Sequence, residues 1–179
     1  MKSLVVYSSL TGNTRKVAEA IYNALPEPKE IHPSDEAPSP EDFDFIATGF
    51  WVDKGTADAK SRQFMETLSG KKVGLFGTLG AYPDSDHGRQ CITRVSELLA
   101  GNQLCGTFLC QGKVDPKLIK MMETTMKDDP HHGMTPERRK RHEEAAKHPD
   151  KNDLINAAGA FAGMAKAICL DLEKKEVRG

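Results

Sequence analysis

The sequence lacks an excess of charge of either sign. Its 179 residues include 25 lysines and arginines against 26 aspartates and glutamates, which gives a formal net charge of −1 at pH 7. Binding to nucleic acid usually needs a strongly basic face, so this balance argues against a nucleic-acid partner. The length is sufficient for one hydrophobic core, and we expect a single domain over residues 1–179.

The sequence also has no apolar run that approaches the length of a membrane span. Its start, "MKSLVVYSSL", lacks the apolar region and cleavage site of a signal peptide. These absences predict a cytoplasmic protein without a membrane partner.

Cysteine is scarce, with four residues that form no C-x-x-C pair and show no metal-ligand spacing. We therefore expect buried free thiols and no metal site. Cys105 and Cys110 are an odd number of residues apart in a predicted strand, which predicts side chains on opposite faces of a sheet.

Hydrophobic patterning predicts strands that alternate with helices. Strand-like runs occupy residues 2–8, 43–50, 71–80 and 103–112, with a weaker one at 29–32; helical spacing follows at 13–25, 57–70, 89–99 and from 151 onward. This order predicts an α/β fold with a doubly wound, five-stranded parallel sheet. Such open sheets bind ligands at the carboxyl ends of their strands, so the loops that follow strands are the candidate sites.

The first of these loops is "SSLTGNT", residues 8–14, which joins a buried strand to a helix. Six of its seven residues are small or polar and none is basic. The N–H groups and the dipole of the following helix favour an anion here, so a phosphate can be bound by neutral donors alone. The patterns G-x-x-x-x-G-K-S/T and G-x-G-x-x-G are both absent, which argues against a nucleoside triphosphate or dinucleotide loop. The alternative is a simple helix cap, which needs only one such residue.

The run "VVYSSLTGNTRKVAEAI", residues 5–21, resembles the phosphate-loop signature of the flavodoxin family. The resemblance implies a doubly wound parallel sheet that carries flavin mononucleotide (FMN) and transfers single electrons. It also implies which residues bind the FMN phosphate: Ser9, Thr11, Gly12, Asn13 and Thr14, with Ser8 at the edge and Leu10 in the same loop.

Two further loops would then hold the flavin ring. The loop at 48–58, "TGFWVDKGTAD", offers apolar walls and a flexible backbone through Gly49, Phe50, Trp51, Val52, Lys54 and Gly55. Either Gly49 or Gly55 can supply the mobile peptide that flavodoxins place beside flavin N5. The loop at 77–88 offers backbone amides and a stacking aromatic through Thr78, Leu79, Gly80, Ala81 and Tyr82. The alternatives are that Phe50 packs in the core and that Tyr82 is only a turn residue.

Residues 114–150 form an insertion between the last strand and the last helix, which flavodoxins do not need. It reads as a helix from Asp115 or Pro116 to Lys127, a loop, and a charged helix opened by Thr135 and Pro136. It contains His131, His132, His142 and His148, and Met121, Met122, Met126 and Met134. Because the insertion begins at the carboxyl edge of the sheet, it is expected to cover the ring, to bind an electron partner, or to lie near a bound haem or bilin, and its histidines and methionines suit the axial positions of haem iron. The alternative is that the methionines pack against the core and the histidines are solvated.

The stretch "GFWVDKGTAD" together with the late insertion resembles a flavodoxin subgroup associated with bilirubin reductase and anaerobic tetrapyrrole reduction. The main hypothesis is an FMN-dependent electron carrier to a reductase, with no catalytic residue of its own. The alternatives are a flavin-dependent reductase that acts directly on a quinone or tetrapyrrole, and a binding module on the same fold without FMN.

Overall fold

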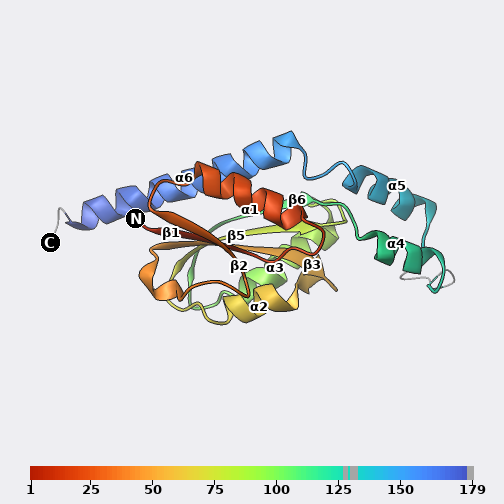
Figure 1. The fold of residues 1–179 in the computed structure, drawn as a ribbon, viewed down its shortest axis with the longest axis horizontal. Coiled ribbons are helices and arrows are strands. Elements are labelled where there is room, and N and C mark those ends of the chain that lie inside the picture. Colours follow the sequence, from red (N-terminus) through yellow and green to blue (C-terminus); the bar gives the residue numbers. More distant parts are fainter. Residues whose placement is uncertain (127–128, 130–132, 177–179) are drawn as a thin grey trace.

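A twisted sheet with helices on both faces forms the body of the molecule (Figure 1). The computed structural model describes residues 1–126, 129 and 133–176, with side chains up to residue 174. The parallel strands are β1 (Ser3–Tyr7), β2 (Lys29–Pro33), β3 (Phe45–Asp53), β5 (Lys72–Leu79) and β6 (Gln103–Gln111). Their order is β2-β1-β3-β5-β6, and a short antiparallel strand β4 (Thr56–Ala57) pairs with β3. The predicted five-stranded, doubly wound parallel sheet is confirmed.

Each face of the sheet has its own hydrophobic core. Helices α1 (Asn13–Ala24) and α6 (Lys151–Glu176) cover one face, whereas α2 (Ala59–Met65) and α3 (Asp86–Glu97) cover the other (Figure 1). A 3-10 turn, η1 (Pro40–Asp42), lies in the proline-rich segment where no full helix was expected. Helix α3 begins three residues before the predicted Arg89, because the Ser85 hydroxyl caps it by accepting the Gly88 N–H at 3.1 Å.

Close packing under α6 depends on glycine. The rings of Phe76 and Phe161 meet edge to face with centroids 5.7 Å apart, and Phe45 lies 6.3 Å from Phe161. A Cβ at Gly74 would lie 2.5 Å from the Phe161 ring, so only glycine lets α6 approach β5 this closely.

The predicted opposite orientation of two cysteines is wrong, because β6 contains a bulge. Val73 pairs with Leu104 but Gly74 pairs with Gly106, so Cys105 has no partner on β5. One extra residue restores the phase of the side chains, and both Cys105 and Cys110 face the α1–α6 side. Cys91 and Cys110 are buried, while Cys105 and Cys169 are half-buried; all four are free thiols.

Helix α6 contains a longer apolar segment than the sequence analysis expected of any part of the chain. An 18-residue window within Lys151–Lys174 has a mean hydropathy of 1.3, and this helix alone in the described part of the chain is long and apolar enough to cross a membrane. In the structure, its residues Ala157, Phe161, Ala165 and Ile168 are buried in the core against the sheet. One face of α6 is therefore packed against the sheet, while 22% of the apolar window as a whole is buried.

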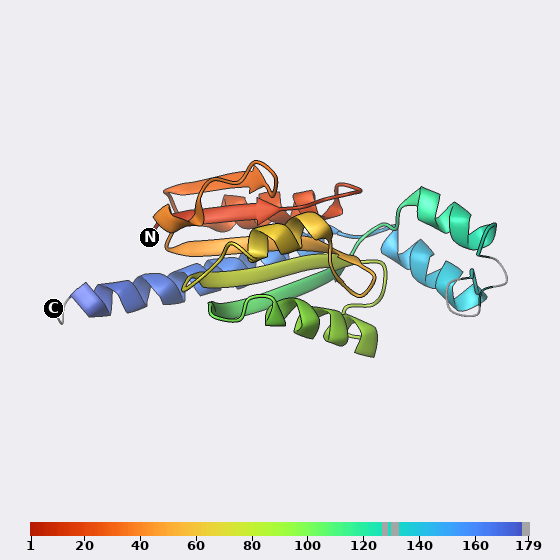
Figure 2. The ribbon, with the colours of Figure 1, turned by 90° about the horizontal axis from the view of Figure 1, so that it is seen from below.

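Two short helices, α4 (Pro116–Glu123) and α5 (Pro136–Ala145), lie beyond the carboxyl ends of the strands (Figures 1 and 2). We call residues 114–147 the arm. Its helices contact each other through Arg139 and Glu123, 2.7 Å apart, and through the Met134 N–H, which donates to the Met122 carbonyl at 3.3 Å. The two views show the arm standing away from the sheet.

The alternative interpretation of the insertion is wrong for several residues. Met121 is exposed and Met122 half-buried on a helix with no buried residue, so these methionines do not pack in the core. His142 is buried rather than solvated, and His148 is partly buried. Helix α4 ends at Glu123, while Lys127, His131 and His132 lie outside the described residues.

Candidate functional site

The candidate phosphate loop follows β1, next to the point where the strand order reverses direction. Strand β1 lies between β2 and β3, so the chain runs to one side of β1 first and then to the other. Ligands of open α/β sheets bind at such a switch point, at the carboxyl ends of the strands. The loop is joined to β3 there, since the Ser8 N–H donates to the Gly49 carbonyl at 3.1 Å.

Gly12 opens the first turn of α1 to a ligand. It has φ +86°, a left-handed conformation that favours glycine, and as the N-cap residue it has no side chain with which to cap the helix. A Cβ placed there would meet nothing within 4 Å, so the space before the helix is free. The N–H groups of the first turn and the helix dipole therefore face an accessible volume suited to an anion.

Side chains of the loop form hydrogen bonds that hold its conformation. The Ser9 hydroxyl accepts the Arg15 N–H at 3.3 Å, and the Thr14 and Thr78 hydroxyls are 2.9 Å apart and buried. The Asn13 amide donates to the Thr11 hydroxyl at 2.8 Å and to the Lys113 carbonyl at 2.9 Å. In this arrangement Asn13 and Thr14 offer a ligand their backbone N–H groups rather than their side chains. Leu10 is exposed at the edge of the loop.

The loop remains uncharged in the structure. The Arg15 guanidinium pairs with Glu19 at 2.8 Å, which raises the pKa of Arg15 and directs its charge along α1. The residues thus fit the phosphate of a flavin mononucleotide bound by neutral donors and a helix dipole, as the sequence predicted.

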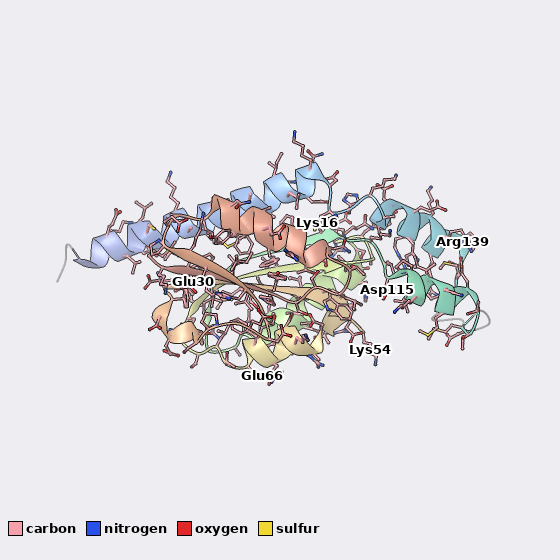
Figure 3. All side chains as sticks on the ribbon, viewed as in Figure 1. Lys16, Glu30, Lys54, Glu66, Asp115 and Arg139 are labelled. Atoms are coloured by element: carbon pink, nitrogen blue, oxygen red, sulfur yellow. The ribbon has the colours of Figure 1, made fainter. Side chains whose placement is uncertain are left out.

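The segment predicted as a loop at 48–58 is a β-hairpin, so strand β3 is longer than expected. It continues to Asp53, and Lys54 (φ +49°) and Gly55 (φ +79°) form the turn into β4. Positive φ at both turn residues is typical of the type I′ turn that matches the twist of a hairpin. In Figure 3, Lys54 at the hairpin tip and Asp115 at the start of α4 lie at the same end of the molecule.

Within this hairpin the candidate residues divide between core and edge. Phe50 is fully buried among the core residues of the α2–α3 face, as the alternative prediction held, and Trp51 and Val52 are half-buried. Side chains alternate along a strand, so Trp51 faces the opposite side, that of α1. Trp51 pairs with Thr78, which places it beside the second candidate loop.

The two candidate glycines for a mobile peptide differ in how strongly hydrogen bonds restrain their carbonyl groups. Gly49 lies inside β3, where its carbonyl accepts the Ser8 N–H and the Ser61 hydroxyl at 3.0 Å. Gly55 lies in the turn, where its carbonyl accepts a weaker bond from Arg94 at 3.3 Å. The structure therefore favours Gly55 for this role.

The second candidate loop begins later than expected, because β5 includes Thr78 and Leu79. Both are buried, and the Leu79 carbonyl accepts the Gly112 N–H at 2.9 Å. Gly80 and Ala81 follow the strand, and a Cβ on Gly80 would lie 2.5 Å from Val114 at the base of the arm. Tyr82 is 42% exposed, which leaves its ring free to cover a ligand.

Sequence reasoning missed two residues that support the site. Asp58 is buried and bonds to the backbone of Trp51 at 3.3 Å. The only sequence signal for Asp58 was an aspartate at the start of the helical pattern predicted over residues 57–70, a residue type that is typical of an N-cap. Lys113 contacts Asn13 although 100 residues separate them, and no local signal predicts such a contact.

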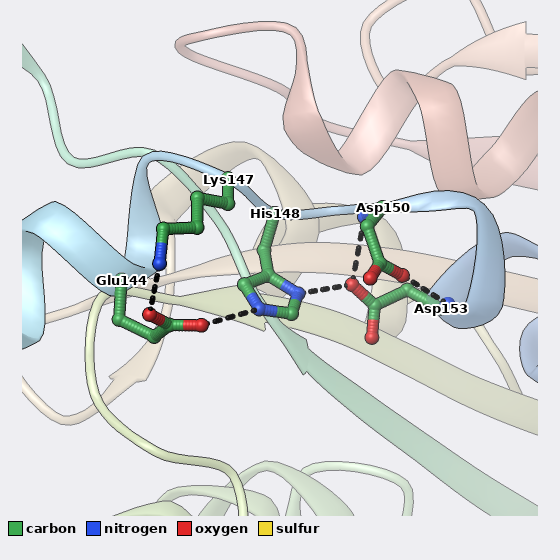
Figure 4. Close-up of polar contacts among 5 residues, drawn as sticks. All are labelled: Glu144, Lys147, His148, Asp150 and Asp153. Carbon is green, nitrogen blue, oxygen red and sulfur yellow. Dashed lines mark hydrogen bonds and ion pairs between the residues drawn. The ribbon is translucent and has the colours of Figure 1, made fainter.

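The base of the arm is joined to the body by a cluster around His148 (Figure 4). Its Nδ1 lies 2.5 Å from Asp153, and its Nε2 lies 3.7 Å from Glu144. The hydrogen bond to Asp153 raises the pKa of His148 above its usual value. Asp150 and Asp153 each accept the other's N–H, at 2.8 and 2.9 Å, and so cap α6 reciprocally. The Lys113 N–H donates to the His148 carbonyl at 3.2 Å, which ties the two ends of the arm together.

The buried thiols are poor nucleophiles. Burial raises the pKa of Cys91 and raises that of Cys110 strongly, and the thiolate is the reactive form of cysteine. His142 on α5 is buried too, and its pKa is lowered first by burial and then by Arg141 and Arg138. It is therefore a neutral imidazole at physiological pH.

Comparison with known proteins identifies relatives along nearly the whole chain. The family model described as "Flavodoxin domain" matches residues 4–162. A curated relative, the flavodoxin-like domain-containing protein BilS of Clostridioides difficile (strain CD3), is 37% identical over 163 residues, which cover 88% of this chain and 93% of the relative.

Solved structures share the fold at lower identity. A flavodoxin from the domain Archaea matches with a TM-score of 0.62 and 19% identity, over 94% of this chain and 99% of its own. A flavoprotein from Lactobacillus acidophilus NCFM, solved in complex with FMN, matches with a TM-score of 0.50 and 17% identity, over 60% of this chain and 92% of its own.

Proposed function

Because this chain belongs to the flavodoxin family, a family of flavin-binding redox proteins, we propose that it binds FMN and carries electrons one at a time to a separate reductase. The observation that carries the proposal is the start of α1 at the switch point of the sheet, where Gly12 at φ +86° has no side chain and leaves open space before the helix. Its neutral donors and helix dipole suit the phosphate of FMN. The FMN-bound Lactobacillus flavoprotein of the same fold supports the choice of cofactor.

In this proposal each loop has a separate role. The phosphate is bound by the N–H groups at the start of α1 and by the hydroxyls of Ser9 and Thr11. The ring is covered by Trp51 of the hairpin and by Tyr82, whose apolar faces exclude water from it. When bound, FMN supplies a group that accepts and releases single electrons. The residues of the chain position it and adjust its potentials.

The partner we propose is a reductase that acts on a haem-derived tetrapyrrole. The relative named BilS and the resemblance of "GFWVDKGTAD" and the insertion to the bilirubin reductase subgroup support this choice. The arm lies at the carboxyl edge of the sheet (Figure 2), so it is suited to contact the reductase or its tetrapyrrole, whether a bilin or haem. The four free cysteines fit a reducing cytoplasm, where we place the protein.

A potentiometric titration of the purified protein tests the proposal. We expect yellow protein that releases FMN on denaturation and takes up two electrons in two steps at separate potentials. Colourless protein that takes up no added FMN would overturn the assignment of the cofactor.

A turnover assay distinguishes a carrier from an enzyme. The protein is mixed with NAD(P)H and either a quinone or bilirubin, with and without a bilirubin reductase. We expect acceptor reduction only when the reductase is present. Multiple turnovers without it would show that the chain is itself a reductase.

A further inference from the structure

We propose that Asp58 is a positioning residue, which fixes the hairpin that carries Trp51 and so prepares one wall of the flavin site. The expected effect on FMN binding rests on the proposed function. The claim that Asp58 fixes the position of Trp51 concerns the protein without any cofactor. Asp58 does not touch the candidate phosphate loop, and it acts through the backbone of Trp51.

Asp58 bonds to Trp51 in both directions. Its own N–H donates to the Trp51 carbonyl at 3.1 Å, and its carboxylate oxygen Oδ2 accepts the Trp51 N–H at 3.3 Å. The two bonds fix both backbone polar groups of Trp51 to a single neighbouring residue. Rotation of the hairpin about this point would break both.

The same carboxylate is anchored to α2. Its Oδ1 accepts the N–H groups of Lys60 and Ser61 at 3.1 and 3.2 Å, which caps the helix. Its Oδ2 also accepts the Ser61 hydroxyl at 2.7 Å. Asp58 is only 3% exposed, so these bonds form away from water, where an unmet polar group is costly.

The anchor acts where the pairing of the hairpin with the sheet ends. Strand β3 pairs with β1 only as far as Gly49 and with β5 only as far as Trp51. Beyond Trp51 its one strand partner is β4, which consists of Thr56 and Ala57 alone. Asp58 supports it at the base and Arg94, whose guanidinium donates to the Gly55 carbonyl, supports it at the tip.

The backbone N–H groups of α2 are capped by Oδ1, whereas the Trp51 N–H is bound by Oδ2, and this makes the two roles separable. An asparagine caps a helix about as well as an aspartate. In Asp58→Asn the amide oxygen can keep the bonds to Lys60 and Ser61. The amide NH₂ then faces the Trp51 N–H, where two donors cannot bond. This variant should preserve α2 and release Trp51.

Fluorescence tests the geometric part without any cofactor, because Trp51 is the only tryptophan in the chain. We expect acrylamide to quench the emission of Asp58→Asn more strongly than that of the wild type, with circular dichroism unchanged. Asp35→Asn is the matched control, because it removes one carboxylate that pairs with Lys60 at 2.6 Å and leaves Trp51 untouched. Equal quenching in wild type and Asp58→Asn would overturn the proposal.

Titration with FMN and with inorganic phosphate tests the consequence. We expect Asp58→Asn to bind FMN about tenfold more weakly, which corresponds to about one lost hydrogen bond, while its affinity for phosphate stays unchanged. Equal loss of both affinities would indicate general damage and would contradict the positioning role. If the wild type itself binds no FMN, the proposed function fails, and the quenching result still decides whether Asp58 fixes Trp51.

Discussion

At the scale of single residues, two glycines have opposite effects on stability, and we expect their substitution by alanine to change the free energy of unfolding in opposite directions. Gly12 has φ +86°, which an L-residue adopts only with strain, whereas Gly163 lies within α6 with open space around it. We expect Gly12→Ala to lower the free energy of unfolding by about 1 kcal/mol and Gly163→Ala to raise it by roughly 0.5–1 kcal/mol. Urea denaturation monitored by circular dichroism measures both.

The sign of these two changes is informative. A stabilising Gly12→Ala would mean that the first turn of α1 is built differently and that no left-handed residue opens it. The open first turn of α1, on which the proposed phosphate site depends, would then be absent.

Trp51 allows a second prediction at this scale. If its indole covers the flavin, Trp51→Ala should weaken FMN binding by about tenfold, because an aromatic contact of this kind contributes roughly 0.5–1.5 kcal/mol beyond its buried area. Trp51→Phe keeps a stacking ring and should lose much less. Titration of each apoprotein with FMN, monitored by flavin fluorescence, gives the affinities. An unchanged affinity in Trp51→Ala would remove this residue from the site.

Features of the site that depend on local sequence could be predicted, whereas those that depend on long-range contacts could not. The unit of strand β1, loop and helix α1 was predictable because its strand, loop and helix signals all fall within residues 5–21. The supports of the site were not predictable, because Lys113 contacts the loop across 100 residues and Asp58 resembles any helix cap. The orientation of Cys105 was wrong because alternation cannot anticipate a bulge.

At the scale of elements, the junction between α5 and α6 should respond to pH. His148 lies between Glu144 of α5 and Asp153 of α6, with Asp150 and Lys147 nearby (Figure 4). The pKa of His148 is raised in the folded protein, chiefly by its hydrogen bond to Asp153. Its contribution to stability is therefore fully present below the ordinary histidine pKa, near 6.5, and is lost as pH rises through the higher folded value.

Hydrogen exchange across this range is the corresponding measurement. We expect amide protection at the start of α6 and in α5 to fall as pH rises above about 6.5, after correction for intrinsic exchange rates. His148→Gln should abolish this dependence, whereas His87→Gln, on the exposed side of α3, should not. A protection profile independent of pH in the wild type would show that the pair of His148 and Asp153 contributes little to the stability of the junction between α5 and α6.

Element boundaries were less predictable than element types. All five parallel strands and the four helices around the sheet were expected from their periodicity, and the structure confirms them. The hairpin after Phe50 was read as a loop, because its turn places Lys54, which is not glycine, at positive φ. Local sequence rules favour Asn-Gly or Asp-Gly there, so "DKGT" gave only a weak signal.

At the scale of the whole molecule, a compact body and a separate arm are joined at one narrow point. The body has two cores with α1 and α6 on one face and α2 and α3 on the other, and its packing accounts for the fold. The arm stands apart in both views and is joined to the body at Lys113, Val114 and His148, while Arg141 and Lys147 of α5 interact electrostatically with Tyr82. The extra residues between the last predicted strand and the last predicted helix indicated the insertion, but its placement depends on these few long-range contacts, which no local pattern encodes.

This division predicts that the arm can be removed without loss of the fold. The Lys113 N–H and His148 carbonyl are 3.2 Å apart, so a short glycine linker can replace residues 115–147 without strain at the junction. We expect the shortened chain to keep its circular dichroism, its melting temperature within a few degrees and its affinity for FMN, because both cores remain intact.

If the arm contacts the reductase, electron transfer to that partner should slow by at least about tenfold, while reduction by dithionite is unaffected. Stopped-flow mixing with the reductase measures the first rate and mixing with dithionite the second. A shortened chain that transfers electrons at the wild-type rate would show that the partner docks elsewhere, and one that loses FMN would show that the arm forms part of the flavin site.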